Sequence, residues 1–172
     1  IKHYKRRYLL FIDNLGIERE GFIAQSARFE AGLLTEMVAI KAPILKNVPL
    51  MSQDQLVFQG FVAVEFLSNK PWGVGAINIG EFINQKGVHA EAAKTILRRA
   101  TAQMESKPSC GIILSSFNSQ NFSIKEWELI FQAAEEVAPG IPMVGISTGG
   151  VFIHQLEQPI LNHQDALTVL LF

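Results

Sequence analysis

The segment best suited to bind a small anion is the turn 147–150, which follows the apolar run 141–146. It consists of Ser147, Thr148, Gly149 and Gly150. The apolar run predicts a buried strand, and the glycine pair allows the chain to turn where a side chain would clash. Backbone N–H groups beside two hydroxyls suit a carboxylate or a phosphate. We therefore expect a ligand-binding turn, the alternative being an ordinary tight strand exit packed against a helix.

A second polar segment leaves another predicted strand and could face this turn. The apolar run 111–114 leads into Ser115 and Ser116, and Asn118 follows shortly after. We expect Ser116 and Asn118 to complete the polar rim of the ligand site, to which we also assign Gly145. The hydroxyl and amide groups of this rim would supply donors and acceptors around the bound group.

A serine hydrolase is the alternative function for the same residues. The pentapeptide 145–149 has the G-x-S-x-G spacing around Ser147, and His154 and His163 are candidate bases. That motif requires a sharp elbow that leads directly into a helix, whereas the apolar residues 151–153 favour further strand. We therefore assign no catalytic residue and expect a binding protein, with a hydrolase that uses Ser147 as the alternative.

Other chemistries find less support in the sequence. The lone Cys110 excludes an internal disulfide and a cysteine zinc site, and we interpret it as a small core residue at a strand start. The four histidines form no ligand pair at helical or hairpin spacing, so we predict no metal and no cofactor. The glycines of segment 73–80 miss the G-x-G-x-x-G spacing of dinucleotide-binding loops. An interaction module that uses exposed Trp72, Phe82 or Phe117 is the third alternative.

Composition indicates a globular protein with a substantial core. The 172 residues are 48% hydrophobic and only 18% charged, enough apolar surface to fold without disulfides or metals. The net charge of −1 gives no general attraction to nucleic acid or to anionic membranes, and no apolar run is long enough to cross a bilayer. With a single cysteine, a cytoplasmic location is expected. Because the chain begins with Ile1 and not with Met, we expect the natural N-terminus to lie upstream.

The elements that must position these groups alternate between strands and helices. Helices are predicted where apolar spacing is helical and capping residues fit, over 18–34, 88–104 and 123–138. Strands are predicted at the apolar runs 8–12, 37–40, 56–58, 61–67, 72–80, 111–114, 141–146 and 166–172.

The order of these elements repeats within the chain. The segment 8–13 matches 111–116, and 58–67 matches 163–172, with a predicted helix after the first strand of each copy. The offset is 103 residues from position 8 to 111 and 105 from position 59 to 164, so it hardly drifts. We predict an α/β (α+β) protein of duplicated strand-helix-strand units, forming a central sheet or two stacked sheets flanked by helices, with a ligand between the halves.

The second half resembles the FIST sensory-domain family. Its helix 88–104, strand segment 109–114, next helix and segment 142–150 are similar to that family's helix, hydrophobic strand, helix and "pVVGcStaG" segment. The residues that match this segment are Gly145, Ser147, Thr148 and Gly150. Ile146 stands where the family often has Cys, Val151 stands where it commonly has Glu, and the end of the chain is similar to the family's "N-x-T" closing strand.

The resemblance implies a domain organisation and a function. It implies a first repeat-like half over 1–80 and a FIST-like second half over 81–172, which we expect to form one compact domain. It also implies a cytoplasmic signalling module that binds a small ligand, with amino acids or similar anionic metabolites as the suggested class. Such modules are joined to signalling output domains or act on partner proteins.

Overall fold

The protein has an α/β fold, as predicted. The computed structural model describes residues 4, 6–13, 34–41, 50–52, 55–57, 61–78, 87–116, 124–148, 150–154, 161–163 and 166–172. The chain divides into two compact units, of which unit 1 comprises Ile1–Asn69 and Val151–Asn162, and unit 2 comprises Lys70–Gly150 and His163–Phe172. The predicted boundary between residues 80 and 81 lies outside the described residues.

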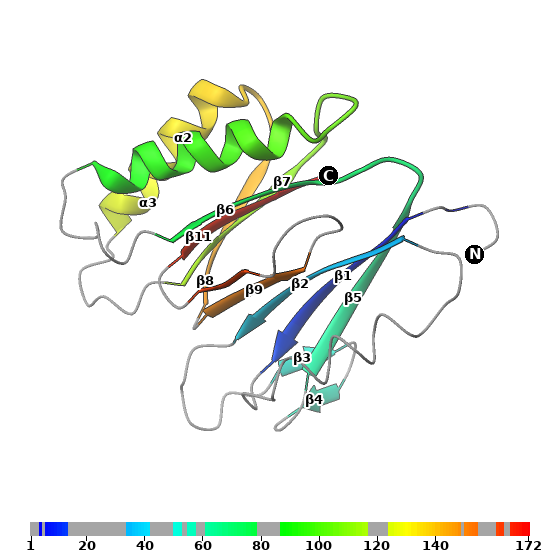
Figure 1. The fold of residues 1–172 in the computed structure, drawn as a ribbon. Coiled ribbons are helices and arrows are strands. Elements are labelled where there is room, and N and C mark those ends of the chain that lie inside the picture. The colour runs from blue at the N-terminus through cyan, green and yellow to red at the C-terminus, as the bar shows by residue number, and fades with distance from the viewer. Residues whose placement is uncertain are drawn as a thin grey trace. The chain divides into compact units, whose positions relative to one another are not determined.

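Unit 1 contains a five-stranded sheet in the order β10-β9-β2-β1-β5 (Figure 1). Its strands are β1 (Arg6–Asp13), β2 (Leu34–Lys41), β5 (Phe61–Ser68), β9 (Gly150–His154) and β10 (Leu161–His163). The strands β3 (Leu50–Ser52) and β4 (Gln55–Val57) pair with each other in a separate two-stranded sheet. The helix predicted over 18–34 falls mainly on residues outside the described part, and Leu34 begins β2. The strands β9 and β10 come late in the chain, after most of unit 2, and return the chain to the sheet of unit 1.

Unit 2 contains a four-stranded mixed sheet with both described helices on one face (Figure 1). The strand order is β6-β11-β7-β8. The elements are β6 (Gly73–Asn78), α2 (Val88–Thr101), β7 (Gly111–Ser115), α3 (Ile124–Val137), β8 (Met143–Ser147) and β11 (Ala166–Leu171). The apolar runs and helical spacing thus predicted every one of these elements to within a few residues.

The two sheets share a three-strand arrangement that agrees with the sequence repeat. In unit 1, β1 is parallel to β2 and antiparallel to β5, and in unit 2, β7 is parallel to β8 and antiparallel to β11. Tyr8 pairs with Phe66, and Gly111 pairs with Leu171. These are the positions that the repeat alignment equates, so the copies share strand register as well as strand order.

Close packing of α2 explains the glycines of β6. A Cβ atom on Gly75 would lie 2.0 Å from the backbone oxygen of Ile96, so only glycine lets the helix lie this close to the strand. The face that α2 turns to the sheet is made of small and aliphatic residues, namely Ala92, Ala93, Ile96, Leu97 and Ala100, all buried. The glycine-rich segment that missed the dinucleotide-binding pattern therefore serves helix packing.

Candidate ligand-binding site

Three strands of unit 2 end at the same edge of its sheet. Because β11 is antiparallel to both β6 and β7, and β7 is parallel to β8, the three strands β6, β7 and β8 run in one direction. Their last residues are Asn78, Ser115 and Ser147. Ligands of α/β sheets bind outside the carboxyl ends of parallel strands. We therefore call this end of the sheet the carboxyl edge and build the candidate site there.

Both helices of unit 2 begin at the carboxyl edge. The helix α2 leads from β6 to β7, and α3 leads from β7 to β8, so each must run back along the sheet to join strands of one direction. Helix N-termini carry unpaired N–H groups and a partial positive charge. At α2 the N-cap position is Gly87, with φ of 80°, which makes no side-chain capping bond.

Strand register places two hydroxyls side by side at this edge. On the face covered by the helices, Ile77, Leu167, Ser115 and Ser147 form one row across the sheet. The preceding row is Gly75, Val169, Ile113 and Gly145 and has no polar side chain. Neighbouring strands lie about 4.8 Å apart, so the side chains of Ser115 and Ser147 are direct neighbours. The polar part of this face is its last row.

Ser115 is the unusual member of this row. Its side chain is 1% exposed, and its Oγ has no hydrogen-bond partner among the residues that the structure describes. Ser147 beside it is exposed, so the row runs from solvent to a buried position. A buried hydroxyl without a partner costs free energy and calls for an explanation such as a ligand. The hydroxyl of Thr168 also lacks a partner there, but alternation along β11 places it on the opposite face.

The hydroxyls of Thr148 and Ser116 are used inside the protein. The Thr148 N–H donates to the Ser115 carbonyl at 2.7 Å, and its hydroxyl lies 3.4 Å from the same oxygen. The Ser116 Oγ accepts from the Ala166 N–H at 3.0 Å and donates to the Ala166 carbonyl at 3.3 Å. Both side chains are buried. They hold the ends of β8 and β11 against the end of β7.

The remaining predicted site residues differ in how far the structure describes them. Gly145 lies in β8, where a Cβ atom would come within 2.5 Å of the Trp127 ring, so its lack of a side chain makes room for this tryptophan. Gly150 begins β9. Gly149 and Asn118 lie outside the described residues. The structure thus brings Ser115, Ser116, Ser147 and Thr148 together at adjoining strand ends.

The strand before the turn is less buried than predicted. The apolar run 141–146 does contain β8, but β8 is the last strand in the order of the unit 2 sheet, and its Val144 side chain is 59% exposed. The prediction of a buried strand is therefore wrong in this respect. An edge position leaves one side of the strand without a neighbour in its own sheet.

Sequence reasoning missed one titratable residue near the helix starts. His89, the second residue of α2, is buried, and burial lowers its pKa below the ordinary value, while the charge of Glu126 raises it to a smaller extent. Glu126 lies in the first turn of α3. A neutral imidazole is therefore favoured beside the two helix N-termini. The contact between the two helices, which a sequence pattern does not reveal, places His89 beside both helix starts.

The nucleophile elbow of a serine hydrolase is not formed at Ser147. The described residues after it continue as the strand β9, whereas the motif requires a helix. Cys110 is exposed just before β7, so the prediction of a core cysteine is wrong. Its carbonyl accepts from the Phe172 N–H at 3.0 Å, so the segment is joined to the end of β11 by backbone pairing. No group of three potential metal ligands occurs in the described part of the chain.

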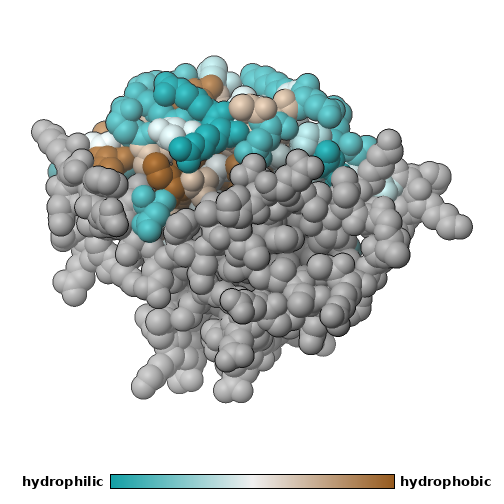
Figure 2. All heavy atoms as spheres, in the orientation of Figure 1, coloured by the Kyte–Doolittle hydropathy of each residue, from teal (hydrophilic) through white to brown (hydrophobic). Residues whose placement is uncertain are grey.

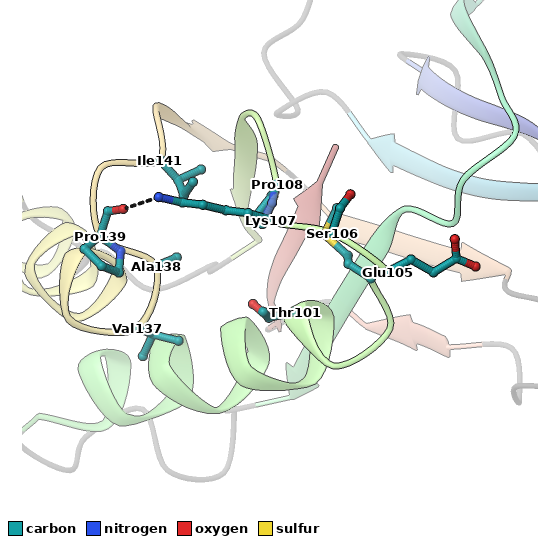
Figure 3. Close-up of a pocket in the computed structure, with 10 residues that line it drawn as sticks. Thr101, Glu105, Ser106, Lys107, Pro108, Val137, Ala138, Pro139 and Ile141 are labelled. Carbon is teal, nitrogen blue, oxygen red and sulfur yellow. Dashed lines mark hydrogen bonds between the residues drawn. The ribbon is translucent and has the colours of Figure 1, made fainter.

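A separate hollow lies at the opposite end of unit 2. Its volume is about 340 Å³, and its lining includes Pro108, Val137 and Ile141, near the C-terminal ends of both helices (Figure 3). Figure 3 shows Lys107 reaching toward Pro139, whose carbonyl accepts a hydrogen bond from the Lys107 Nζ at 3.4 Å. A cation is favourable at a helix C-terminus. Lys107 therefore already supplies the cation that is favourable in this hollow. The hollow lies away from the Ser115 row.

Within the described residues, no helix is long and apolar enough to span a membrane. The chain matches no protein-family model and no curated protein sequence.

Proposed function

We propose that this chain is a small-ligand-binding sensory domain and that the carboxyl edge of unit 2 binds an amino acid or a similar small anionic metabolite. The observation that carries this proposal is the buried, unpartnered Ser115 hydroxyl beside the exposed Ser147. A ligand oxygen that accepts from Ser115 would remove the cost of burying that hydroxyl. Ser147, at the solvent end of the row, would contact the same ligand.

The electrostatics of the edge favour an anion. Two helix N-termini point to this end of the sheet, and the N-cap of α2 has no side chain that would occupy its N–H groups. The glycine turn after β8, with Gly149 and Gly150, is expected to add backbone N–H groups, as the sequence suggested. A carboxylate satisfies these donors at a lower desolvation cost than a doubly charged phosphate, which is why we favour an amino acid.

Within this proposal the predicted site residues have different roles. Ser115 and Ser147 bind the ligand, whereas Ser116 and Thr148 keep the strand ends in register through the bonds to Ala166 and to the Ser115 carbonyl. Asn118 stays a predicted rim residue. The similarity to FIST domains supports a signalling role, in which ligand binding is passed on to an output domain or to a partner protein in the cytoplasm.

Isothermal titration calorimetry with the common amino acids, acetate and succinate tests the proposal. We expect saturable binding of at least one compound by the wild type. Ser147→Ala or Ser115→Ala removes a hydrogen bond to the ligand and should weaken binding at least about tenfold, since hydrogen bonds to charged groups contribute roughly 1.5–3 kcal/mol. If the wild type binds none of these compounds, the proposed function is wrong.

A further inference from the structure

An apolar strip runs along the outer side of α3. It is lined by Ile124, Trp127, Glu128, Phe131, Gln132 and Glu135 and borders a shallow hollow of about 560 Å³. Ile124 is 78% exposed, and the rings of Trp127 and Phe131 stack with centroids 5.7 Å apart. Figure 2 shows apolar side chains at the surface of the unit that carries α2 and α3, among hydrophilic neighbours. We refer to the six lining residues as the α3 strip.

The spacing of the α3 strip suits a helical partner. Positions 124, 127, 128, 131, 132 and 135 recur at intervals of three and four, which places them on one side of the helix over about 16 Å. A strip of this length presents three turns to a second helix that packs alongside it. Isolated apolar residues at a surface are ordinary, but Ile124, Trp127 and Phe131 adjoin one another over the first two turns of α3, and a contiguous apolar patch indicates a contact surface.

The topology of unit 2 leaves the helix position beside this strip unfilled within the described residues. Each of the parallel strands β6 and β7 is followed by a helix that packs on the sheet, α2 and α3 respectively. After β8 the chain continues as β9 and joins the sheet of unit 1, so no described helix follows β8. In a sheet with helices on one face, the next helix would lie over β8, next to α3. Trp127 already covers Gly145 of β8 from this side.

The charge of the strip identifies the complementary partner. The described residues that line the hollow include two carboxylates, Glu128 and Glu135, and no cation. The Glu135 carboxylate accepts from the Gly140 N–H at 3.1 Å, which holds it in place at the end of α3. Two copies of the strip would bring these carboxylates together, which opposes self-association. Lysine or arginine side chains on the partner would instead complement them.

We propose that the α3 strip binds an amphipathic helix of a partner protein, with apolar residues at three- and four-residue spacing flanked by lysine or arginine. The apolar side of this helix covers Ile124, Trp127 and Phe131, and its cations face Glu128 and Glu135. This is the helix-in-groove mode of recognition. The α3 strip starts near the carboxyl edge, where Trp127 covers Gly145, but it contains neither Ser115 nor Ser147, and its test uses peptides and not the proposed ligand.

Selection from a displayed library of peptides about 16 residues long, each long enough for four helical turns, tests this inference. The bait is the full chain, and peptides that also bind Ile124→Glu are removed. We expect the remaining peptides to have apolar residues in the stated spacing and an excess of lysine and arginine. Binding of one such synthetic peptide is then measured by Trp127 fluorescence in a Trp72→Phe background, since the chain has only two tryptophans.

Two matched variants separate the strip from the rest of α3. Ile124→Glu should raise the Kd about tenfold or more, because it places a charge in the contact. Leu129→Glu is the control, since Leu129 is 41% exposed on α3 but does not line the hollow, and it should change the Kd less than about twofold. Glu128→Lys should remove the preference for basic peptides, because one cation then balances the remaining carboxylate of Glu135.

Three results would overturn the inference. The first is that no peptide distinguishes the wild type from Ile124→Glu. The second is that the selected peptides are acidic or uncharged. The third is that light scattering shows a dimer of the full chain that Ile124→Glu converts to monomer, because the strip is then covered by a second copy of this chain.

Discussion

Two adjacent serines should respond in opposite ways to replacement by alanine. Ser115 buries a hydroxyl that has no partner among the described residues, so Ser115→Ala removes an unsatisfied group. Ser116 supplies an acceptor to the buried Ala166 N–H at 3.0 Å, so Ser116→Ala leaves that N–H without a partner. The first change should stabilise the ligand-free protein, and the second should destabilise it.

The magnitudes follow from the cost of an unsatisfied buried polar group. That cost is about 1–3 kcal/mol, so Ser116→Ala should lower the unfolding free energy by about 2 kcal/mol. Ser115→Ala should raise the unfolding free energy by about 1 kcal/mol, the lower end of the same range. The gain from removing the unsatisfied hydroxyl is partly offset by the packing contacts that are lost around the vacated volume. The unfolding free energies of the two variants should therefore differ by about 3 kcal/mol, although the two substitutions lie at adjacent positions in the chain.

Urea denaturation followed by tryptophan fluorescence measures this difference. Both tryptophans, Trp72 and Trp127, belong to unit 2, so their emission reports on the unit that contains the serines. Ser147→Ala is the control, because Ser147 is exposed in the same row and its loss should change the unfolding free energy by less than about 0.5 kcal/mol. If Ser115→Ala destabilises the protein as much as Ser116→Ala, the Ser115 hydroxyl has a partner inside the protein and the argument for a ligand is refuted.

Two further predictions concern packing and protonation in unit 2. Gly75→Ala should lower the unfolding free energy by about 3 kcal/mol, because its Cβ would lie 2.0 Å from the Ile96 carbonyl oxygen and would push α2 away from β6; an unchanged urea midpoint would contradict this packing. His89→Gln should weaken the loss of stability at acid pH. Burial lowers the pKa of His89 from 6.5, so the unfolded chain takes up a proton more readily, and the wild-type unfolding free energy should fall as the pH drops through 6.5 and level off below the folded-state pKa. Urea titrations of both proteins between about pH 5 and 8 check this, and equal pH dependence of the two proteins would show that His89 is not the group responsible.

The arrangement of strands was largely predictable from the sequence. The repeat equated Tyr8 with Gly111 and Phe66 with Leu171, and these residues occupy equivalent pairs in the two sheets. Apolar runs and capping residues located the helices and strands of unit 2, because burial of a periodic apolar pattern decides where such elements form. No sequence pattern predicted that the chain passes from β8 into the sheet of unit 1, because the sequence of a strand does not specify which strand it pairs with.

The meeting of the two polar strand ends was predictable from the sequence, but the residues that face the helices there were not. The polar segments after two strands predicted that these strand ends meet, and Ser115 does pair with Ser147. The sequence favoured Ser116 over Ser115, yet adjacent residues of a strand point to opposite faces, and only the register decides which one faces the helices. Gly145 was assigned to ligand binding, whereas its contact with Trp127 depends on tertiary packing that no local pattern encodes.

An NMR titration of the isotope-labelled full chain with the amino acid that gives the largest calorimetric signal tests the central claim most directly. The account predicts that amide shifts concentrate at Ser115, Ser147 and the first residues of α2 and α3, and that Ser115→Ala moves the titration midpoint to a ligand concentration at least about tenfold higher. Shifts confined to the hollow around Lys107, or no shifts with any amino acid, would contradict it.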